Sequence, residues 1–310
     1  MDPLFLYSLN IAVYIGIFAI VALSLNLEYG FAGLGNFGKV AFFLVGAYAY
    51  TLLAQTGIHF TLSIILSSMI AGAFGLLVSL PALRLREDYL AIVTLAFGEI
   101  IRIVVKAEDW IARGVWGITV PSAINLKDAS YEITILANIG LVFFSLAICF
   151  IFLQLVANSP YGRIIRAIRE DAMAADTLGK NNFKYKAQVF MMGSIVAGLG
   201  GALFAQYIGY IQPQMFLPIL TFTIWIMVIL GGPANNYGVV VGAILVQLFE
   251  RGTMIIKDYI ALPIDPNNIQ YILFGILIII ILLYRPSGLY KESKVKTSAT
   301  KRALKWLNRS

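Results

Sequence analysis

The sequence predicts an all-α membrane protein, a polytopic bundle of about nine transmembrane helices (eight to ten) with an amphipathic helix on its cytoplasmic side. Of its 310 residues, 60% are hydrophobic and only 13% are charged, and the mean hydropathy is +0.84. An average soluble chain carries about a quarter charged residues, whereas apolar runs of about 20 residues are typical of helices that cross a bilayer. Most of this chain is therefore expected in lipid.

Nine apolar runs, bounded by charged or turn-forming residues, are the candidate spans. They cover residues 4–27, 40–55, 60–82, 89–106, 132–157, 187–209, 216–231, 238–256 and 269–284. The 40–55 and 216–231 runs have about 16 residues, just below the usual range of about 17–25, so tilted or broken helices are expected there. The first run has no basic cluster before it and no small-residue cleavage site after it, which favours a retained helix over a signal peptide.

Lysine and arginine concentrate in the 158–186 loop and in the tail from residue 285 onward. Short positively charged loops stay in the cytoplasm, so both segments are expected there, and the even number of spans between them allows it. The more acidic 107–131 and 257–268 loops are then outside, as is the N-terminus. We expect a membrane domain over 1–290 and a basic cytoplasmic tail over 291–310. This tail either contacts anionic lipid or is simply solvated; a nucleic-acid partner is not favoured.

The 158–186 loop is long and polar, yet it is patterned as a helix. Ser159 is a good N-cap, Pro160 suits the first helical position and Gly179 suits the end. Apolar residues recur at helical spacing, at Tyr161, Ile164, Ile165, Ile168, Ala172, Ala175 and Leu178. The pattern predicts one amphipathic helix over 159–179, which either lies in the headgroups or docks on a partner.

Within this loop, Ala174-Ala175 followed by Leu178-Gly179 resembles the latter part of the EAA loop of ABC importer permeases. The surrounding stretches, 159–171 and 185–186, together with 25–48, are similar to branched-chain amino-acid permeases of the LivH/LivM kind. The 89–100 and 114–121 stretches look more like LivM than LivH. Two residues depart from the family pattern: Asn36 stands where many relatives have serine, and Lys39 where many have histidine.

The resemblance implies the permease subunit of an ABC importer for leucine, isoleucine, valine or related hydrophobic amino acids. The implied partners are a LivH-like second permease, two ATP-binding cassette subunits and an extracytoplasmic binding protein. The chain is then not an enzyme and needs no cofactor, since it contains no phosphate-binding Gly-x-x-x-x-Gly-Lys-Ser/Thr loop and ATP binds to the partners. The residues implied to contact an ATPase subunit are Arg169, Glu170, Ala174, Ala175, Leu178 and Gly179.

Two glycine-containing motifs stand in corresponding places of the two halves. The first, Gly33 with Asn36-Phe37-Gly38, precedes the 40–55 run, and the second, Gly231-Gly232-Pro233 with Asn236-Tyr237-Gly238, leads into the 238–256 run. Such breaks point to a transport path, although chance similarity of two turns is the alternative. Thr94 is either part of that path or a bond between helices. Glu99 lies in an apolar run and is expected to face the interior, either paired with Arg102 or touching substrate. The candidate path residues are Asn36, Phe37, Gly38, Thr94, Glu99, Asn236, Tyr237 and Gly238.

Three other functions stay open. A urea or short-amide permease of the same family differs only in substrate. An ion-driven secondary transporter is disfavoured because it needs buried carboxylates along several spans, and Glu99 is nearly alone. A membrane enzyme or a structural subunit is the third; the single cysteine, Cys149, and the single histidine, His59, form no metal or nucleophile cluster in the sequence.

Overall fold

The computed structural model describes residues 3–85, 87–121, 131–259 and 287–292, with positions 272, 275, 276, 279 and 283–285. Six helices in these parts are long: α1 (Pro3–Leu25), α3 (Phe60–Ala82), α4 (Glu87–Ala107), α6 (Tyr131–Asn158), α9 (Asn182–Ile208) and α11 (Asn236–Tyr259). Two are shorter: α2 (Lys39–Gln55) and α10 (Ile219–Gly231). Eight of the nine expected runs are thus helical. The ninth, 269–284, and the tail beyond 292 lie largely outside the described residues.

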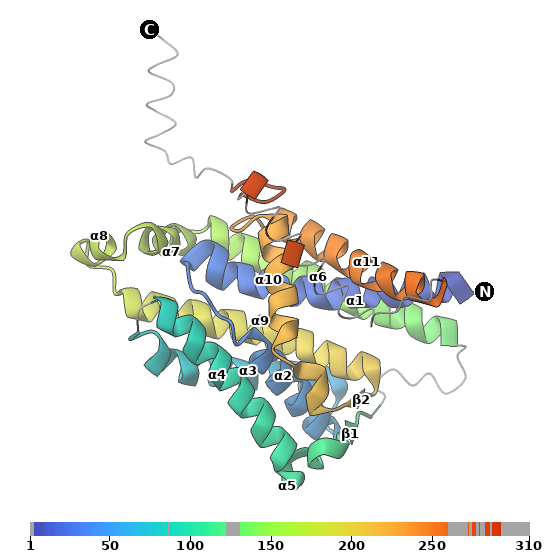
Figure 1. The fold of residues 1–310 in the computed structure, drawn as a ribbon. Helices are drawn as coiled ribbons and strands as arrows, with labels where there is room; N and C mark the ends of the chain where they lie inside the picture. The colour runs from blue at the N-terminus through green and yellow to red at the C-terminus, as the bar shows by residue number, and fades with distance from the viewer. Residues whose placement is uncertain are drawn as a thin grey trace.

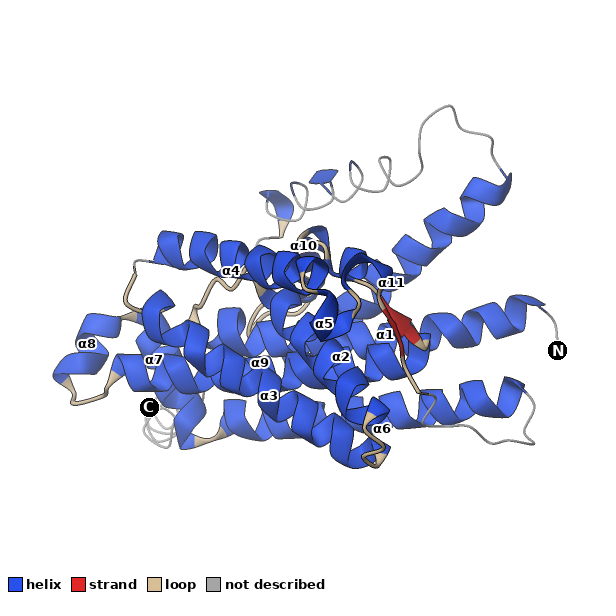
Figure 2. Cartoon of the chain, turned by 90° about the horizontal axis from the view of Figure 1, so that it is seen from below, coloured by secondary structure: helices blue, strands red, loops and turns tan. Residues whose placement is uncertain are grey.

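Four helical stretches in the described parts are long and apolar enough to cross a membrane: Phe5–Phe31, Phe60–Ala82, Ile133–Asn158 and Asn182–Ile208. The predicted shortness of the 40–55 and 216–231 runs is confirmed, because α2 and α10 are short apolar helices. Most long helices lie side by side, whereas α10 crosses them steeply (Figure 1). The helices α7 (Pro160–Glu170) and α8 (Ala172–Thr177) lie at one end of this bundle, opposite the N-terminus (Figures 1 and 2).

The remaining described elements are small. They are the π-helical segment η1 (Asn26–Phe31), α5 (Asp109–Ala112), the 3-10 turns η2 (Gly114–Trp116) and η3 (Pro213–Phe216), and the strands β1 (Ile118–Thr119) and β2 (Tyr210–Ile211). The two strands pair antiparallel, Ile118 with Ile211, and so join the segment after α5 to the end of α9. The all-α prediction is therefore confirmed apart from this single short pair in the described parts of the chain.

Glycines set the close packing of the centre, where α9 lies against α2 and α3. A side chain on Gly46 of α2 would overlap the backbone of Gly198 on α9, and one on Gly201 would overlap the carbonyl of Phe43. In lipid there is little hydrophobic force between helices, so small residues that let backbones approach are a main source of their association. The α2–α9 contact is therefore a tightly packed part of the bundle, and other elements pack around it.

The prediction of one helix over 159–179 is wrong in one respect. The chain forms α7 and α8 with a break at Asp171, whose backbone is extended and whose Oδ1 accepts a hydrogen bond from Ala174 N (2.9 Å). Asp171 is thus the N-cap of a second helix. The predicted cap at Ser159 is confirmed, since its Oγ accepts a bond from Gly162 N (3.2 Å). Leu178, at the end of the predicted apolar stripe, is 78% exposed.

Candidate functional site

The site begins where α1 stops being an α-helix. Residues Asn26–Phe31 form the π-helical segment η1, and the chain then runs through the segment 32–38, which is outside any helix from residue 33, before α2 starts. Gly33 has a φ of +71°, the left-handed conformation that a glycine adopts without strain. Leu34 N donates to Glu28 O (2.8 Å), so the chain turns back toward η1 directly after leaving it. π-Helical turns are rare, and they are frequently found at functional sites.

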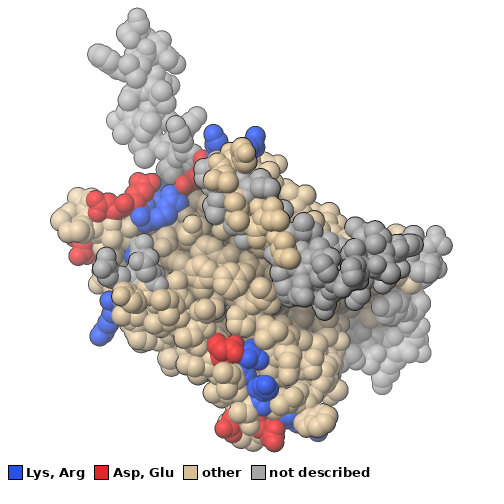
Figure 3. Space-filling model, viewed as in Figure 1, with Lys and Arg blue, Asp and Glu red and all other residues tan. Residues whose placement is uncertain are grey.

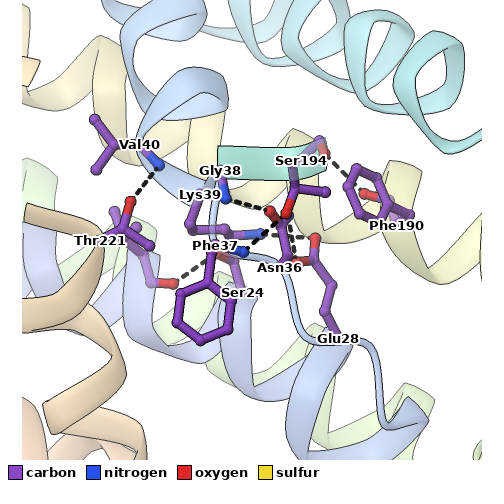
Figure 4. Close-up of polar contacts among 12 residues, drawn as sticks. Ser24, Glu28, Asn36, Phe37, Gly38, Lys39, Val40, Phe190, Ser194 and Thr221 are labelled. Atoms are coloured by element: carbon purple, nitrogen blue, oxygen red, sulfur yellow. Dashed lines mark hydrogen bonds and ion pairs between the residues drawn. The ribbon is translucent and has the colours of Figure 1, made fainter. Parts of the chain in front are cut away.

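A fully buried ion pair fixes this turn. Lys39 Nζ lies 2.7 Å from Glu28 Oε1, and both side chains have 0% exposure. Asn36 Nδ2 donates to the other carboxylate oxygen of Glu28 (2.9 Å), so that Lys39 and Asn36 converge on one group (Figure 4). The carboxylate fits because Gly193 of α9 has no side chain in its place. Burying two charges is costly unless geometry and extra hydrogen bonds compensate, and this arrangement supplies both.

This pair was not predicted. Lys39 stood out only as a departure from the family pattern, and Glu28 follows directly on the first apolar run. The expectation that Glu99 is nearly alone as a buried carboxylate is therefore wrong, because Glu28 is the more deeply buried of the two. The available signal was an acidic residue at the end of a span followed by a lysine at the start of the next.

The structure brings four of the predicted path residues together. Phe37 N donates to Thr94 Oγ1 (3.1 Å), and Gly38 N donates to Asn36 Oδ1 (2.9 Å). A side chain on Gly38 would overlap the carbonyl of Thr94, so a glycine is required for α4 to pass this closely. Irregular backbone survives in a membrane only where protein or water satisfies it. Here the polar groups of α4 and of the segment itself satisfy it.

Helix α10 covers the same segment with two side chains that the sequence analysis missed. Thr221 Oγ1 accepts a bond from Val40 N (3.3 Å), a free N–H of the first turn of α2. Trp225 Nε1 donates to the carbonyl of Asn36 (3.2 Å), and its ring stacks on Phe37 with centroids 4.6 Å apart. The 32–38 segment is therefore held between α4 and α10.

Glu99 lies at the edge of this assembly. Its predicted partner is confirmed: Arg102 Nε donates to Glu99 Oε2 (2.9 Å), and a second nitrogen contacts the other oxygen. The expected interior position is confirmed only in part, since the side chains of Arg102 and Glu99 are 12% and 35% exposed. Charged side chains on the face in Figure 3 gather mainly over α7–α8 and over α4–α5, with a broad surface without charged residues between.

A narrow pocket lies between Glu99, Phe37, Gly38, Phe216 and Thr221. Its volume is about 10 Å³, which is room for one water molecule at most. An amino acid does not fit, so the described arrangement is closed around the segment.

The second motif occupies a different place. Asn236 accepts from Asn26 Nδ2 and donates to Gln154 Oε1, each at 2.9 Å, so it ties α11 to the start of η1 and to α6. Gly238 is buried, whereas Tyr237 is 59% exposed and lies against Phe150. Tyr237 faces an apolar pocket of about 770 Å³ between α6 and α11. Asn236 thus supports the start of η1, Gly238 lies against Gly231 of α10, and Tyr237 lies against Phe150 of α6 instead.

The six residues assigned to ATPase contact divide into two sets. The exposed set is Glu170, Ala174, Leu178 and Gly179. Ala175 is only 4% exposed and packs inside the chain, and the guanidinium of Arg169 turns inward to the carbonyl of Gly30. The exposed face also carries Met173, 82% exposed, which the sequence analysis did not include.

Burial also shifts the pKa values of two side chains of α7. Burial, and to a lesser extent the neighbouring Tyr185, raises the pKa of Tyr161 to about 12, and burial lowers the pKa of Arg166. Tyr161 is therefore a neutral packing residue at the base of the loop. Arg166 keeps its charge, because an arginine side chain does not lose its proton in proteins.

Comparison with known proteins bears on what this arrangement does. Residues 7–282 match the family of the branched-chain amino acid transport system permease component. The chain is 31% identical to the probable branched-chain amino acid transport permease protein LivM of Methanocaldococcus jannaschii, over 95% of this chain and 96% of that protein. It is 30% identical to the Escherichia coli LivM permease, over 95% of this chain and 73% of that protein. It is 23% identical to the E. coli LivH permease, over 90% and 92%.

No solved structure matches the chain. The family resemblance drawn from the sequence is confirmed, and the LivM proteins above share more identity with the chain than LivH does. The chain belongs to the branched-chain amino acid transport permease family.

Proposed function

We propose that this chain is the LivM-type permease subunit of an ABC importer that carries branched-chain or related hydrophobic amino acids into the cell. The observation that carries the proposal is the segment 32–38, which is non-helical from residue 33 and largely buried inside an otherwise helical membrane bundle, where polar groups of α4 and α10 hold it. Such a break suits a transport path. The substrate class rests on the names of the relatives.

Passage of substrate requires α4 or α10 to withdraw from the segment, since the pocket beside Glu99 holds about 10 Å³. In this proposal Asn36, Phe37, Gly38 and Thr94 form the closed point of the path. Asn236 supports it through its hydrogen bond with Asn26 of η1. Alternating access is then the separation of α4 from this point.

The second permease subunit, LivH-like, covers the edge of α4 in this proposal. The Glu99–Arg102 pair is partly exposed, on a helix that also exposes Ile92, Ile100 and Ile103. A charged pair facing lipid is costly, whereas a partner subunit can cover it with polar groups.

An extracytoplasmic binding protein would meet the opposite end from α7 and α8, where β1, β2 and α5 lie. The nine-span topology, with an external N-terminus and the basic tail beside lipid, belongs to the same proposal.

The ATPase subunits dock on the exposed face of α7–α8 in this proposal. Leu178 is 78% exposed and Met173 82%, which suits a small apolar cluster that becomes desolvated on docking. Leu178→Glu should abolish copurification of the ATPase subunits while the permease still reaches the membrane. Val115→Glu places the same charge on an exposed apolar residue far from α8 and should leave copurification of the ATPase subunits unchanged.

Uptake assays complete the test. Deletion of this chain should abolish uptake of radiolabelled leucine, and unlabelled isoleucine and valine should compete with that uptake. Competition by urea or short amides instead would assign the alternative substrate. ATPase association and leucine uptake that both survive Leu178→Glu would contradict the docking assignment.

A further inference from the structure

The segment 287–292 returns to the bundle and attaches to the end of α10. Leu289 N donates to Leu230 O (2.9 Å) and Tyr290 N donates to Gly231 O (3.0 Å), which is a short stretch of backbone pairing. Asn235 Nδ2 donates to Lys291 O (3.0 Å) on the other side. These bonds fix the position of the next residue, Glu292.

Glu292 pairs with two arginines of α7. One carboxylate oxygen lies 2.8 Å from a terminal nitrogen of Arg169, and the other lies 3.2 Å from Nε of Arg166. The arginine side chains are 22% and 9% exposed, and that of Glu292 is 32% exposed. Glu170 approaches Arg169 only at 3.9 Å and is 75% exposed, so Glu292 is the principal counter-charge of both arginines in the described structure.

Each arginine has a second contact beyond Glu292. Arg169 donates to the carbonyl of Gly30, in the π-helical segment η1. Its Cγ lies opposite Gly33, where a side chain would come within 3.0 Å of it. Arg166 donates to Ala157 O (3.1 Å) and covers the ring of Phe31, 4.9 Å from the ring centroid. Both guanidinium groups therefore touch the part of the chain that carries Glu28 and leads into 32–38.

Glu292 thus stands where three elements meet. Through Arg166 and Arg169 it joins α7 to η1, and through the 287–292 segment it joins α7 to the end of α10. These are two of the elements that close the path: η1 holds the buried ion pair, and α10 holds Thr221 and Trp225. Without the carboxylate, two neighbouring positive charges would face each other with little compensation, and α7 would be free to move apart from α10.

We propose that Glu292 is a positioning residue for transport, which makes α7, η1 and the end of α10 move together when the ATPase subunits move α7. The inference rests on the proposed function. A purely structural role, in which Glu292 only anchors the segment 287–292, predicts reduced stability without a change in the substrate moved per ATP.

The test uses the complete transporter in proteoliposomes, with uptake and ATP hydrolysis measured together. Glu292→Gln keeps the size of the side chain and removes its charge. It should lower the substrate moved per ATP at least about tenfold, the size expected for a lost charge-assisted pair, while the ATPase subunits remain bound. Glu292→Asp keeps the charge on a shorter side chain and should lower it a fewfold. Lys291→Gln, the matched control, should leave it unchanged.

A wild-type ratio of transport to hydrolysis in Glu292→Gln overturns the inference. Should Glu292→Gln not assemble, Glu292→Asp decides, and a wild-type ratio in that variant overturns the inference as well. Failure of the proposed function looks different: the unaltered chain would then neither retain ATPase subunits nor support amino-acid uptake.

Discussion

The buried pair of Glu28 and Lys39 offers the sharpest stability prediction. Glu28→Gln leaves the ammonium of Lys39 without a counter-charge at a position of 0% exposure. Removing one partner of a buried ion pair costs about 3–5 kcal/mol, a large share of the roughly 5–15 kcal/mol by which proteins are stable. At about 2–4 °C per kcal/mol, the melting temperature in detergent should fall by about 10 °C. Lys39→Met should have an effect of similar size.

The double variant makes the prediction refutable. With Glu28→Gln and Lys39→Met together no charge is stranded, and the new glutamine still accepts a hydrogen bond from Asn36. The double variant should therefore be more stable than either single one, with a coupling of about 2–3 kcal/mol. Thermal melting followed by size-exclusion chromatography measures this, with Lys180→Met as the exposed-lysine control. Additive losses in the double variant would show that the pair contributes no coupling and that the reasoning is wrong.

Three further predictions follow from other parts of the structure. A cysteine at Asp109 should react with an impermeant thiol reagent from outside and one at Lys184 should not; external labelling at Lys184 would reverse the topology. Glu99→Ala strands Arg102 and should cut the yield of folded protein, and apolar replacement of both should restore part of it; normal yield with lost uptake would instead favour substrate contact. Gly193→Ala should destabilise the chain by about 1–3 kcal/mol in thermal melting, because its Cβ overlaps the buried carboxylate of η1; an unchanged melting temperature would contradict that packing.

The sequence predicts well those features that depend on contact with lipid or on residues close to one another in the chain. Hydropathy locates the helices because each must present apolar side chains to its surroundings, and eight expected runs are helical. The Glu99–Arg102 pair was predictable because its members lie three residues apart on one helix. The Ser159 cap was predictable because the capping bond spans only three residues.

What it does not predict depends on contacts between distant segments. Glu28 and Lys39 meet only because a π-helical turn and an irregular segment bring them together, and neither has a periodic signature. Thr221 and Trp225 act on residues about 180 positions earlier. The break at Asp171 did have a local signal, since aspartate favours an N-cap, but the continuous apolar stripe concealed it.

The π-helical turn at residues 26–31 also constrains how this chain can change in length. Each residue of an α-helix turns the chain by about 100° and advances it by about 1.5 Å, so one residue more or less redirects every side chain beyond it. A single deletion within η1 would restore a regular helix and rotate Glu28 away from the gap at Gly193. A point substitution in this stretch alters the contacts of one residue, whereas a one-residue deletion separates Glu28, Asn36 and Lys39 in one event. Natural variation in this part of the protein should therefore change residue identity and preserve the count of 11 positions from Glu28 to Lys39.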